Sequence, residues 1–207
     1  MRYDDKDHGP DVRFDDPAFI HPSVLIHGKV RVRKRASIWP YTVIRAENYE
    51  VDIGENANIQ DFVMIHVGIE SGTHVGPDCS VAHRAILHGC SLGPNTLVGV
   101  NATLMDGVEV GANCIIGAGA LLIENTKVPD NSIVVGAPGK VIKTRNNYVH
   151  NRFNAWIYAL NAEAYARGEH RRWDEDGFRA EAKAKMKALM AELAALKEAG
   201  DPIAKDA

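Results

Sequence analysis

The chain has 207 residues, of which 45% are hydrophobic, and its formal net charge is -3 at pH 7. This length suits one main domain with an appendage, and the charge gives no reason to expect nucleic acid as a partner. The charged N-terminus MRYDDKDHGPDVRFDD is not a secretory signal, and no stretch approaches the roughly 20 apolar residues of a membrane span. We therefore expect a cytoplasmic protein without a membrane partner.

A six-residue repeat occupies most of the chain. Aliphatic residues recur at every sixth position, with three extra residues after Ile44, four extra after Ile65 and one fewer after Leu87. The repeated positions are Ile20, Ile26, Val32, Ile38, Ile44, Ile53, Ile59, Ile65, Val75, Val81, Leu87, Leu92, Val98, Leu104, Val110, Ile116, Leu122, Val128 and Val134. The residue two places before each of them is small or β-branched. Residues two apart on a strand share a face, so both positions point inward.

This period predicts an all-β solenoid over residues 15-140, a parallel β-helix of hexapeptide repeats. It resembles known hexapeptide-repeat proteins, in which three repeats make one triangular coil and the coil is left-handed. The three cysteines, Cys79, Cys90 and Cys114, all fall on the small inward position. There a cysteine acts as a small buried hydrophobe. An odd number without a CxxC pair argues against a disulfide framework and a cysteine-rich zinc site.

The basic stretch at residues 28-35 directs Lys29, Arg31 and Arg33 outward. Such a stretch can contact phosphate or a partner. The favoured interpretation is a solvated face that discourages pairing at the sheet edge.

The C-terminal part changes to a helical period. From about Asn147 to Arg167 an apolar stripe is expected to pack on the solenoid, and it consists of Tyr148, Phe153, Trp156, Ile157, Leu160 and Tyr165. A second helix is expected to start near Asp174, a plausible N-cap, and to end at Gly200. Residues 145-200 are thus predicted to form a helical extension that packs on the solenoid or on a partner subunit.

Two columns of side chains follow from three repeats per coil. The residues after Ile44, Ile65 and Leu87 are Arg45, His66 and His88, which should point outward in one column. Neighbouring strands lie about 4.8 Å apart, so the two histidines can share a metal. His83 lies on the preceding side of the triangle, in a second column that contains Pro40 and Asp61.

A straight prism cannot bring these two columns together within one chain. In a parallel homotrimer, the first column of one subunit would face the second column of the next. Three imidazoles would then leave a fourth metal position for water, which is the arrangement of a catalytic zinc site. Surface histidines satisfied by hydrogen bonds are the other interpretation, and it is preferred for His8, His21, His27, His74, His150 and His170.

Several segments resemble the gamma-class carbonic anhydrase family, including its relatives from phenylacetate and carnitine operons. These segments are WPYTVIRAE, IGENANIQD, VMIH, VAHRAILHGCSLGPNTLVG and VVGAPGKVIK, and the resemblance covers about residues 15 to 145. It implies a left-handed β-helix, a homotrimer, and a metal at each subunit interface that activates water to attack carbon dioxide. The metal is zinc, or sometimes iron or cobalt.

The resemblance also assigns individual residues. His66, His83 and His88 match the metal ligands of the family. Arg45 and Asp61 match its arginine and aspartate, and we interpret them as an intersubunit ion pair. Gln60 matches its glutamine and can orient water or substrate through its amide. Glu47 can accept a proton, or form an ion pair at a corner.

Departures from the family pattern lie near the expected metal. Arg45-Ala46-Glu47 stands where the family commonly has Arg-Gly-Asp, and Asn48 stands where the archetype has an acidic residue for proton transfer. These changes preserve metal binding but affect the choice of substrate.

Three functions therefore compete. The favoured one is reversible hydration of carbon dioxide. The alternatives are hydrolysis of a larger substrate such as an acyl-CoA thioester, and a catalytically silent structural trimer. Acyl transfer ranks lower, because hexapeptide transferases usually rely on histidine without a three-histidine metal site.

Overall fold

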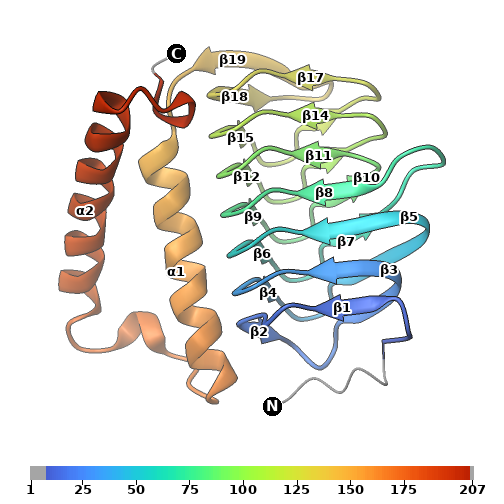
Figure 1. Cartoon of the computed structure of the whole chain (residues 1–207), viewed down its shortest axis with the longest axis horizontal. Helices are drawn as coiled ribbons and strands as arrows, with labels where there is room; N and C mark the ends of the chain where they lie inside the picture. Colours follow the sequence, from blue (N-terminus) through green and yellow to red (C-terminus); the bar gives the residue numbers. More distant parts are fainter. Residues whose placement is uncertain (1–7, 206–207) are drawn as a thin grey trace.

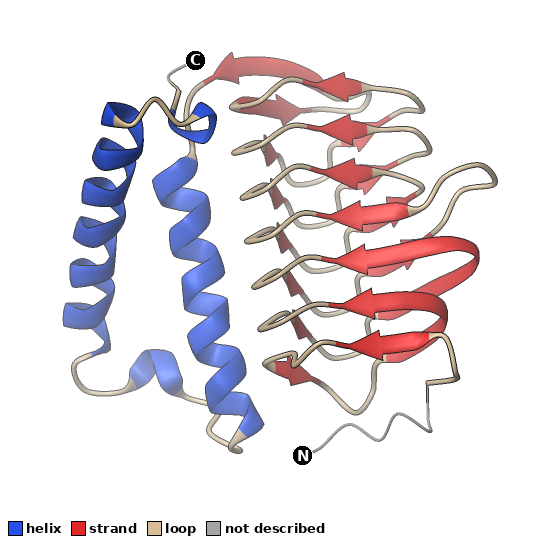
Figure 2. Ribbon diagram, in the orientation of Figure 1, coloured by secondary structure: helices blue, strands red, loops and turns tan. Residues whose placement is uncertain are grey.

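The computed structural model describes residues 8–205. It shows a solenoid of stacked coils with two helices along one side (Figures 1 and 2). The parallel β-helix predicted from the six-residue period is confirmed. The first seven residues of the N-terminal segment that we interpreted as lacking a signal sequence lie outside the described residues. Among the described residues, no helix has the length and apolar content to cross a bilayer.

Each coil contributes strands to three faces, which stack in parallel from coil to coil. The covered face consists of β2 (Phe19–Ile20), β4 (Ser37–Ile38), β6 (Asn58–Ile59), β9 (Ser80–Val81), β12 (Leu97–Val98), β15 (Ile115–Ile116) and β18 (Ser132–Val135), with β19 (Lys140–Thr144) antiparallel at its end. The histidine face consists of the first parts of β3 (Leu25–Val32) and β5 (Val43–Ile53), then β7 (Met64–His66), β10 (Ile86–His88), β13 (Thr103–Leu104) and β16 (Leu121–Leu122). The charged face consists of β1 (Val12–Phe14), the last parts of β3 and β5, β8 (Thr73–Val75), β11 (Ser91–Leu92), β14 (Glu109–Val110) and β17 (Lys127–Val128).

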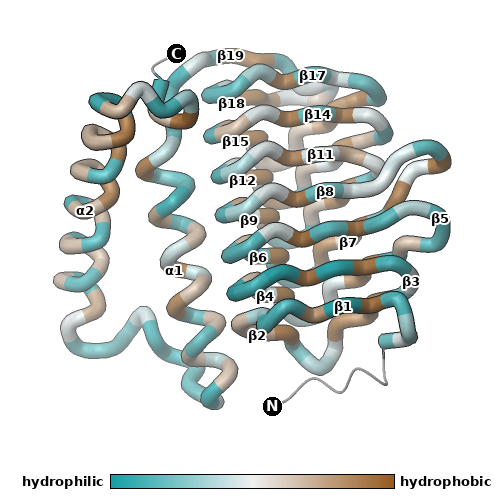
Figure 3. Tube along the Cα trace, viewed as in Figure 1, coloured by the Kyte–Doolittle hydropathy of each residue, from teal (hydrophilic) through white to brown (hydrophobic). Residues whose placement is uncertain are grey.

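The core is the inside of the prism. All the repeated aliphatic residues are at most 5% exposed and belong to one cluster. Hydrophobic and hydrophilic segments alternate along the tube in Figure 3, as the period requires. Burying each such side chain stabilises the fold by roughly 1.5–3 kcal/mol, so the register of the coils is fixed by the core.

Two helices complete the chain. α1 (Tyr148–Ala166) contacts β2, β4, β6 and β9 along the covered face, and α2 (Phe178–Glu198) packs on α1 (Figure 1). Single turns of 3-10 helix lie at Arg172–Asp174 and Pro202–Ala204. Leu189 is the one residue that α2 buries fully.

The expected packing of α1 on the solenoid is found in part, since Tyr148 of the apolar stripe is buried and Tyr165 packs against Phe19 and Trp39. The buried residues of α1 are mainly small, such as Asn151, Ala155 and Ala162, while Trp156 of the apolar stripe stays partly exposed. The covered face supplies the large side chains instead, since Ala162 packs against buried Phe19 and Trp39 of the solenoid. Large residues on both surfaces would keep the helix too far from the sheet.

The predicted start of the second helix near Asp174 is wrong. Asp174 lies in the 3-10 turn, where it pairs with Arg171. The chain then passes through Gly177, whose φ of 88° lies in the left-handed region, and α2 begins at Phe178. A glycine adopts this conformation without the steric cost of a Cβ, so the reversal falls after Asp174 and the helix starts later.

The three cysteines are free and buried, as the sequence predicts. Burial raises the pKa of Cys79 and Cys90 to about 12 and that of Cys114 to about 11. The folded state therefore favours the neutral thiol. This contribution to stability is complete below the ordinary thiol pKa of 9.0 and is lost as the pH rises through the raised values.

We expect all three thiols to resist a thiol-specific chromogenic reagent in the native protein near neutral pH, because the thiolate is the reactive form. In denaturant all three should react. The measurement is the absorbance of the released chromophore with and without denaturant, with circular dichroism as the control for folding. Rapid reaction of one thiol in the folded protein would contradict the buried placement.

Candidate metal centre

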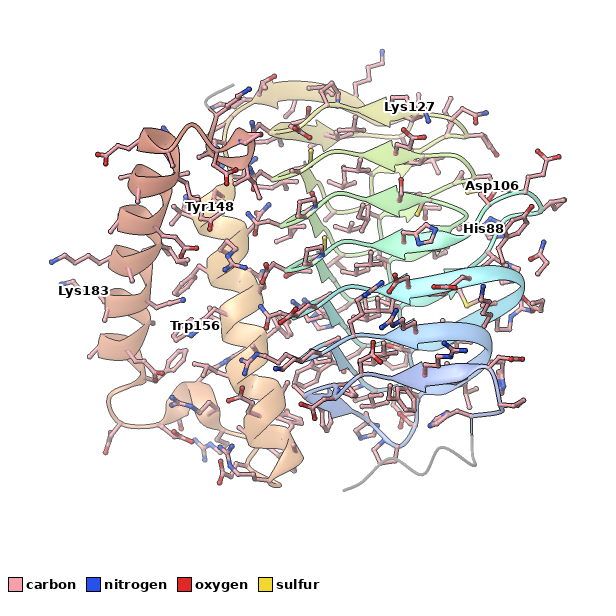
Figure 4. The ribbon with its side chains drawn as sticks, viewed as in Figure 1. His88, Asp106, Lys127, Tyr148, Trp156 and Lys183 are labelled. Carbon is pink, nitrogen blue, oxygen red and sulfur yellow. The ribbon has the colours of Figure 1, made fainter. Side chains whose placement is uncertain are left out.

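The histidine face carries the first predicted column. The parallel register of β5, β7 and β10 stacks Arg45, His66 and His88. His66 Nδ1 lies 3.0 Å from His88 Nε2, and the ring centroids are 5.0 Å apart. Figure 4 labels His88 on the side of the solenoid that lies away from the helices. The structure thus brings together two of the three predicted metal ligands.

His83 lies in the second column, after β9. Its Nδ1 is 2.9 Å from Asp61 Oδ2, one coil below. Its Nε2 is 3.5 Å from the hydroxyl of Tyr158 on α1. Burial raises the pKa of Tyr158 to about 12, with a smaller effect from the charge of Asp61. Within the described part of the chain, no three His, Cys, Asp or Glu side chains gather into a metal-binding group.

Each of the three imidazoles contacts one carboxylate. Glu47 Oε2 lies 2.9 Å from His66 Nε2, and Asp61 contacts His83 as described. Asp106 contacts His88 Nδ1. An ionised carboxylate can only accept a hydrogen bond, so the contacted nitrogen carries the ring proton. The other nitrogen of each neutral ring then holds a lone pair.

Two of these lone pairs face each other. His66 Nδ1 and His88 Nε2 are the nitrogens left without a proton, and they are 3.0 Å apart. Such an arrangement needs a proton or a cation between the two atoms. In a tetrahedral zinc site with Zn–N bonds of about 2.0–2.1 Å, two ligand nitrogens lie about 3.3–3.4 Å apart. The two imidazoles are thus donors of the kind that a divalent metal takes, and their nitrogens lie slightly closer together than two ligands of one zinc ion.

Arg45 and Glu47 form an ion pair with each other within the chain. Arg45 is thus not brought to Asp61 by the fold of one subunit. Desolvation acts to raise the pKa of Glu47, but hydrogen bonds from its own backbone and from His66, with the charges of His66 and Arg45, bring this pKa below its ordinary value. Glu47 is therefore ionised at neutral pH and a weak base, which suits the orientation of His66 better than proton capture.

Gln60 is buried, with 3% of its surface exposed. Its Nε2 donates to Asn58 Oδ1 at 3.0 Å. This bond uses one of the two N–H groups of the amide, so the amide oxygen and the second N–H are the atoms that can orient a water or a substrate.

The outward cations of the basic stretch are neutralised on the charged face. Each one pairs with a carboxylate of a neighbouring strand or corner: Lys29 with Glu50 at 3.0 Å, Arg31 with Asp15 at 2.6 Å, and Arg33 with Asp52 at 2.6 Å. The hydrogen bond to Asp52 raises the pKa of Arg33. These ion pairs indicate that the basic stretch is a solvated face rather than a phosphate-binding site.

Sequence reasoning missed Asp106 and Tyr158. Counting one coil beyond His88 leads to Met105, and Asp106 is the next residue, in the corner beside Gly89. No such count reaches Tyr158, because its position depends on how α1 docks.

Comparisons with known proteins show what this chain is similar to. The bacterial transferase hexapeptide family (six repeats) matches residues 89–124. The protein named "Probable carbonic anhydrase" from Methanocaldococcus jannaschii is 46% identical over 124 residues, which cover 60% of this chain and 78% of that protein. Gamma carbonic anhydrase 1, mitochondrial, from Arabidopsis thaliana is 36% identical over 44% of this chain, and the match spans only 36% of that relative's length.

A solved structure supports the fold. The hexapeptide transferase family protein from Anaplasma phagocytophilum is 31% identical, with a TM-score of 0.66 over 76% of this chain and 96% of that one.

Proposed function

This chain belongs to the gamma-class carbonic anhydrase family of left-handed, hexapeptide-repeat β-helix proteins, and we propose that it is a metal-dependent enzyme that hydrates carbon dioxide reversibly to bicarbonate. One observation carries this proposal: His66 Nδ1 and His88 Nε2 lie 3.0 Å apart. The other nitrogen of each of these two rings contacts a carboxylate, Glu47 or Asp106. His83, anchored in the same way by Asp61, is the third ligand in this proposal.

A second copy of the chain is needed to complete the site. The outward residues of the histidine face beside the His66 column form a mostly apolar ladder of Leu25, Val43, Met64, Ile86, Thr103 and Leu121. Tyr41 and Phe62 stack at the corner that carries His83, and each is more than half exposed. Exposed apolar surface next to an incomplete site favours a subunit interface. We therefore propose a homotrimer in which His66 and His88 meet His83 of the partner subunit.

The residues have distinct roles in this proposal. A bound Zn²⁺, with Fe²⁺ or Co²⁺ as alternatives, supplies a water ligand with a pKa of about 7 and hence a nucleophile at neutral pH. Gln60 offers its amide oxygen to orient the water. Glu47 contacts both His66 and solvent, and its side chain is 52% exposed. Its lowered pKa keeps it ionised at neutral pH, so in this proposal it accepts the hydrogen bond from His66 and holds that ring in place.

Hydrolysis of an acyl-CoA thioester is the alternative enzymatic function. It requires cations for the phosphates of the cofactor, yet the basic stretch is paired with carboxylates along the charged face. This observation favours the smaller substrate. A silent structural trimer would keep the apolar ladder without needing three anchored imidazoles.

The purified protein should bind about one zinc per chain and accelerate carbon dioxide hydration, while a panel of acyl-CoA thioesters should be hydrolysed slowly or not at all. Elemental analysis, stopped-flow hydration with a pH indicator, and a thiol-release assay measure the three quantities. His27→Ala is the control, since His27 heads the column without touching the candidate ligands. A protein that binds the metal and cleaves thioesters but does not hydrate carbon dioxide would make thioester hydrolysis the preferred function.

His83→Ala and His66→Ala chains should complement each other in mixed trimers. Every site of each pure mutant lacks one ligand, whereas a mixed trimer regains a complete site where an intact His83 meets an intact His66 and His88. Native mass spectrometry identifies the mixed trimers, and their zinc content and activity are then measured. Mixed trimers that recover neither property would show that the ligands are not shared between subunits.

Arg45→Ala and Asp61→Ala should each weaken the trimer, because a pair across the interface that loses one partner leaves a buried charge, at a cost of roughly 3–5 kcal/mol. The double variant should be less harmful than the sum of the two. Trimer dissociation measured by sedimentation for all three variants tests this coupling. The control cycle is Arg31 with Asp15, a pair within one subunit on the charged face. Additive effects for Arg45 and Asp61 would refute the intersubunit pair.

A further inference from the structure

We propose that Asp106 is a positioning residue, which sets the nitrogen that His88 offers to a metal. Asp106 follows β13 on the coil after His88, and its Oδ1 contacts His88 Nδ1 (Figure 4). The inference rests on the proposed function, since His88 is a candidate ligand there. Neither the family pattern nor the repeat assigns a role to this carboxylate.

The carboxylate acts through the position of one proton. Because Asp106 accepts at Nδ1, the neutral ring of His88 keeps its lone pair on Nε2, which points to His66 Nδ1 at 3.0 Å. Without this acceptor, the ring proton can move to Nε2 and be donated to His66. The resulting bond between the two histidines would occupy both nitrogens that the metal needs. Asp106 therefore keeps the pair open for a cation.

The backbone around Asp106 holds the carboxylate in place. Gly107 N donates to Gly89 O at 2.9 Å, and Asn125 N donates to Asp106 O at 2.8 Å, so the corner is tied to both adjacent coils. A Cβ at Gly89 would lie 2.6 Å from Asp106 Oδ1, and one at Gly68 would lie 2.9 Å from it. The two glycines thus leave the space that the carboxylate occupies beside His88.

The same device occurs in the second column. Asp61 contacts Nδ1 of His83 at 2.9 Å from the adjacent coil, and this also leaves Nε2 without the ring proton. Two imidazoles on different faces are therefore presented through the same nitrogen. Glu47 contacts the other nitrogen, Nε2, of His66, so the feature common to all three imidazoles is one carboxylate that fixes the position of the ring proton.

The test compares Asp106→Asn with Asp15→Asn, because the two aspartates have similar side-chain exposure, 41% and 42%, and Asp15 lies on the charged face. Nitrogen-15 NMR of the metal-free trimer, well above the ordinary imidazole pKa of about 6.5, reports which nitrogen of His88 carries the proton. A His88→Gln variant assigns the signals. We expect Nδ1–H in the wild type and in Asp15→Asn, and a shift toward Nε2–H in Asp106→Asn.

Zinc affinity is the second measurement. A chelator competition should show that Asp106→Asn binds Zn²⁺ about 10–100-fold more weakly than Asp15→Asn, with unchanged circular dichroism. If Asp106→Asn does not assemble, Gly68→Ala replaces it. The added methyl meets the side chains of Asp106 and Ser71 and no backbone atom is among its nearest contacts, so it displaces the carboxylate.

Two results would overturn the inference: His88 retaining Nδ1–H without the carboxylate, or a zinc affinity equal to that of the control. A wild-type protein that binds no zinc would instead count against the proposed function. The NMR measurement on metal-free protein would still decide the role of Asp106, so the two failures are distinguishable.

Discussion

The fixed register of the stacked coils is the constraint on which the rest of the molecule depends. Ile44, Ile65 and Leu87 are each fully buried, and their pairing in register sets Arg45, His66 and His88 above one another. A spacing of about 4.8 Å between strands is close enough for two imidazoles to reach one atom. A slip of one residue would turn the histidines into the apolar interior. The free energy of core burial therefore also fixes the geometry of the candidate site.

The corners are where the chain varies without disturbing that register. The three residues inserted after Ile44 lengthen β5 through a corner, and pairing resumes at Val51 with Thr73. The insertion carries Asn48, whose amide donates to the carbonyls of Gly68 and Ile69 at 3.3 and 3.1 Å. The same corner presents Glu47 to His66. A corner can thus acquire polar groups beside the metal columns while both adjoining faces keep their alignment.

The sequence was sufficient to predict the parts that depend on counting. The period of six gave the strands, the buried cysteines and the two columns, because each inward residue fixes the direction of its neighbours. The sequence was not sufficient where the position of a side chain depends on the backbone torsion of a corner or on how a helix packs on the solenoid. Asp106 lies in a corner whose course depends on Gly107, with a φ of 69°. The docking of α1 depends on Trp39, a solenoid residue that no helical pattern includes. The start of α2 was missed because an N-cap pattern does not reveal a reversal three residues later.

Charge explains why the site suits a divalent cation in particular. Each proposed interface would gather Glu47, Asp106 and Arg45 from one subunit with Asp61 of the partner subunit, around three neutral imidazoles. Three carboxylates and one guanidinium leave two negative charges, which a divalent cation would neutralise. Carboxylates at this position raise the basicity of the imidazoles and fix their orientation. The carboxylates of the proposed interface therefore favour the metal itself and do not select the substrate.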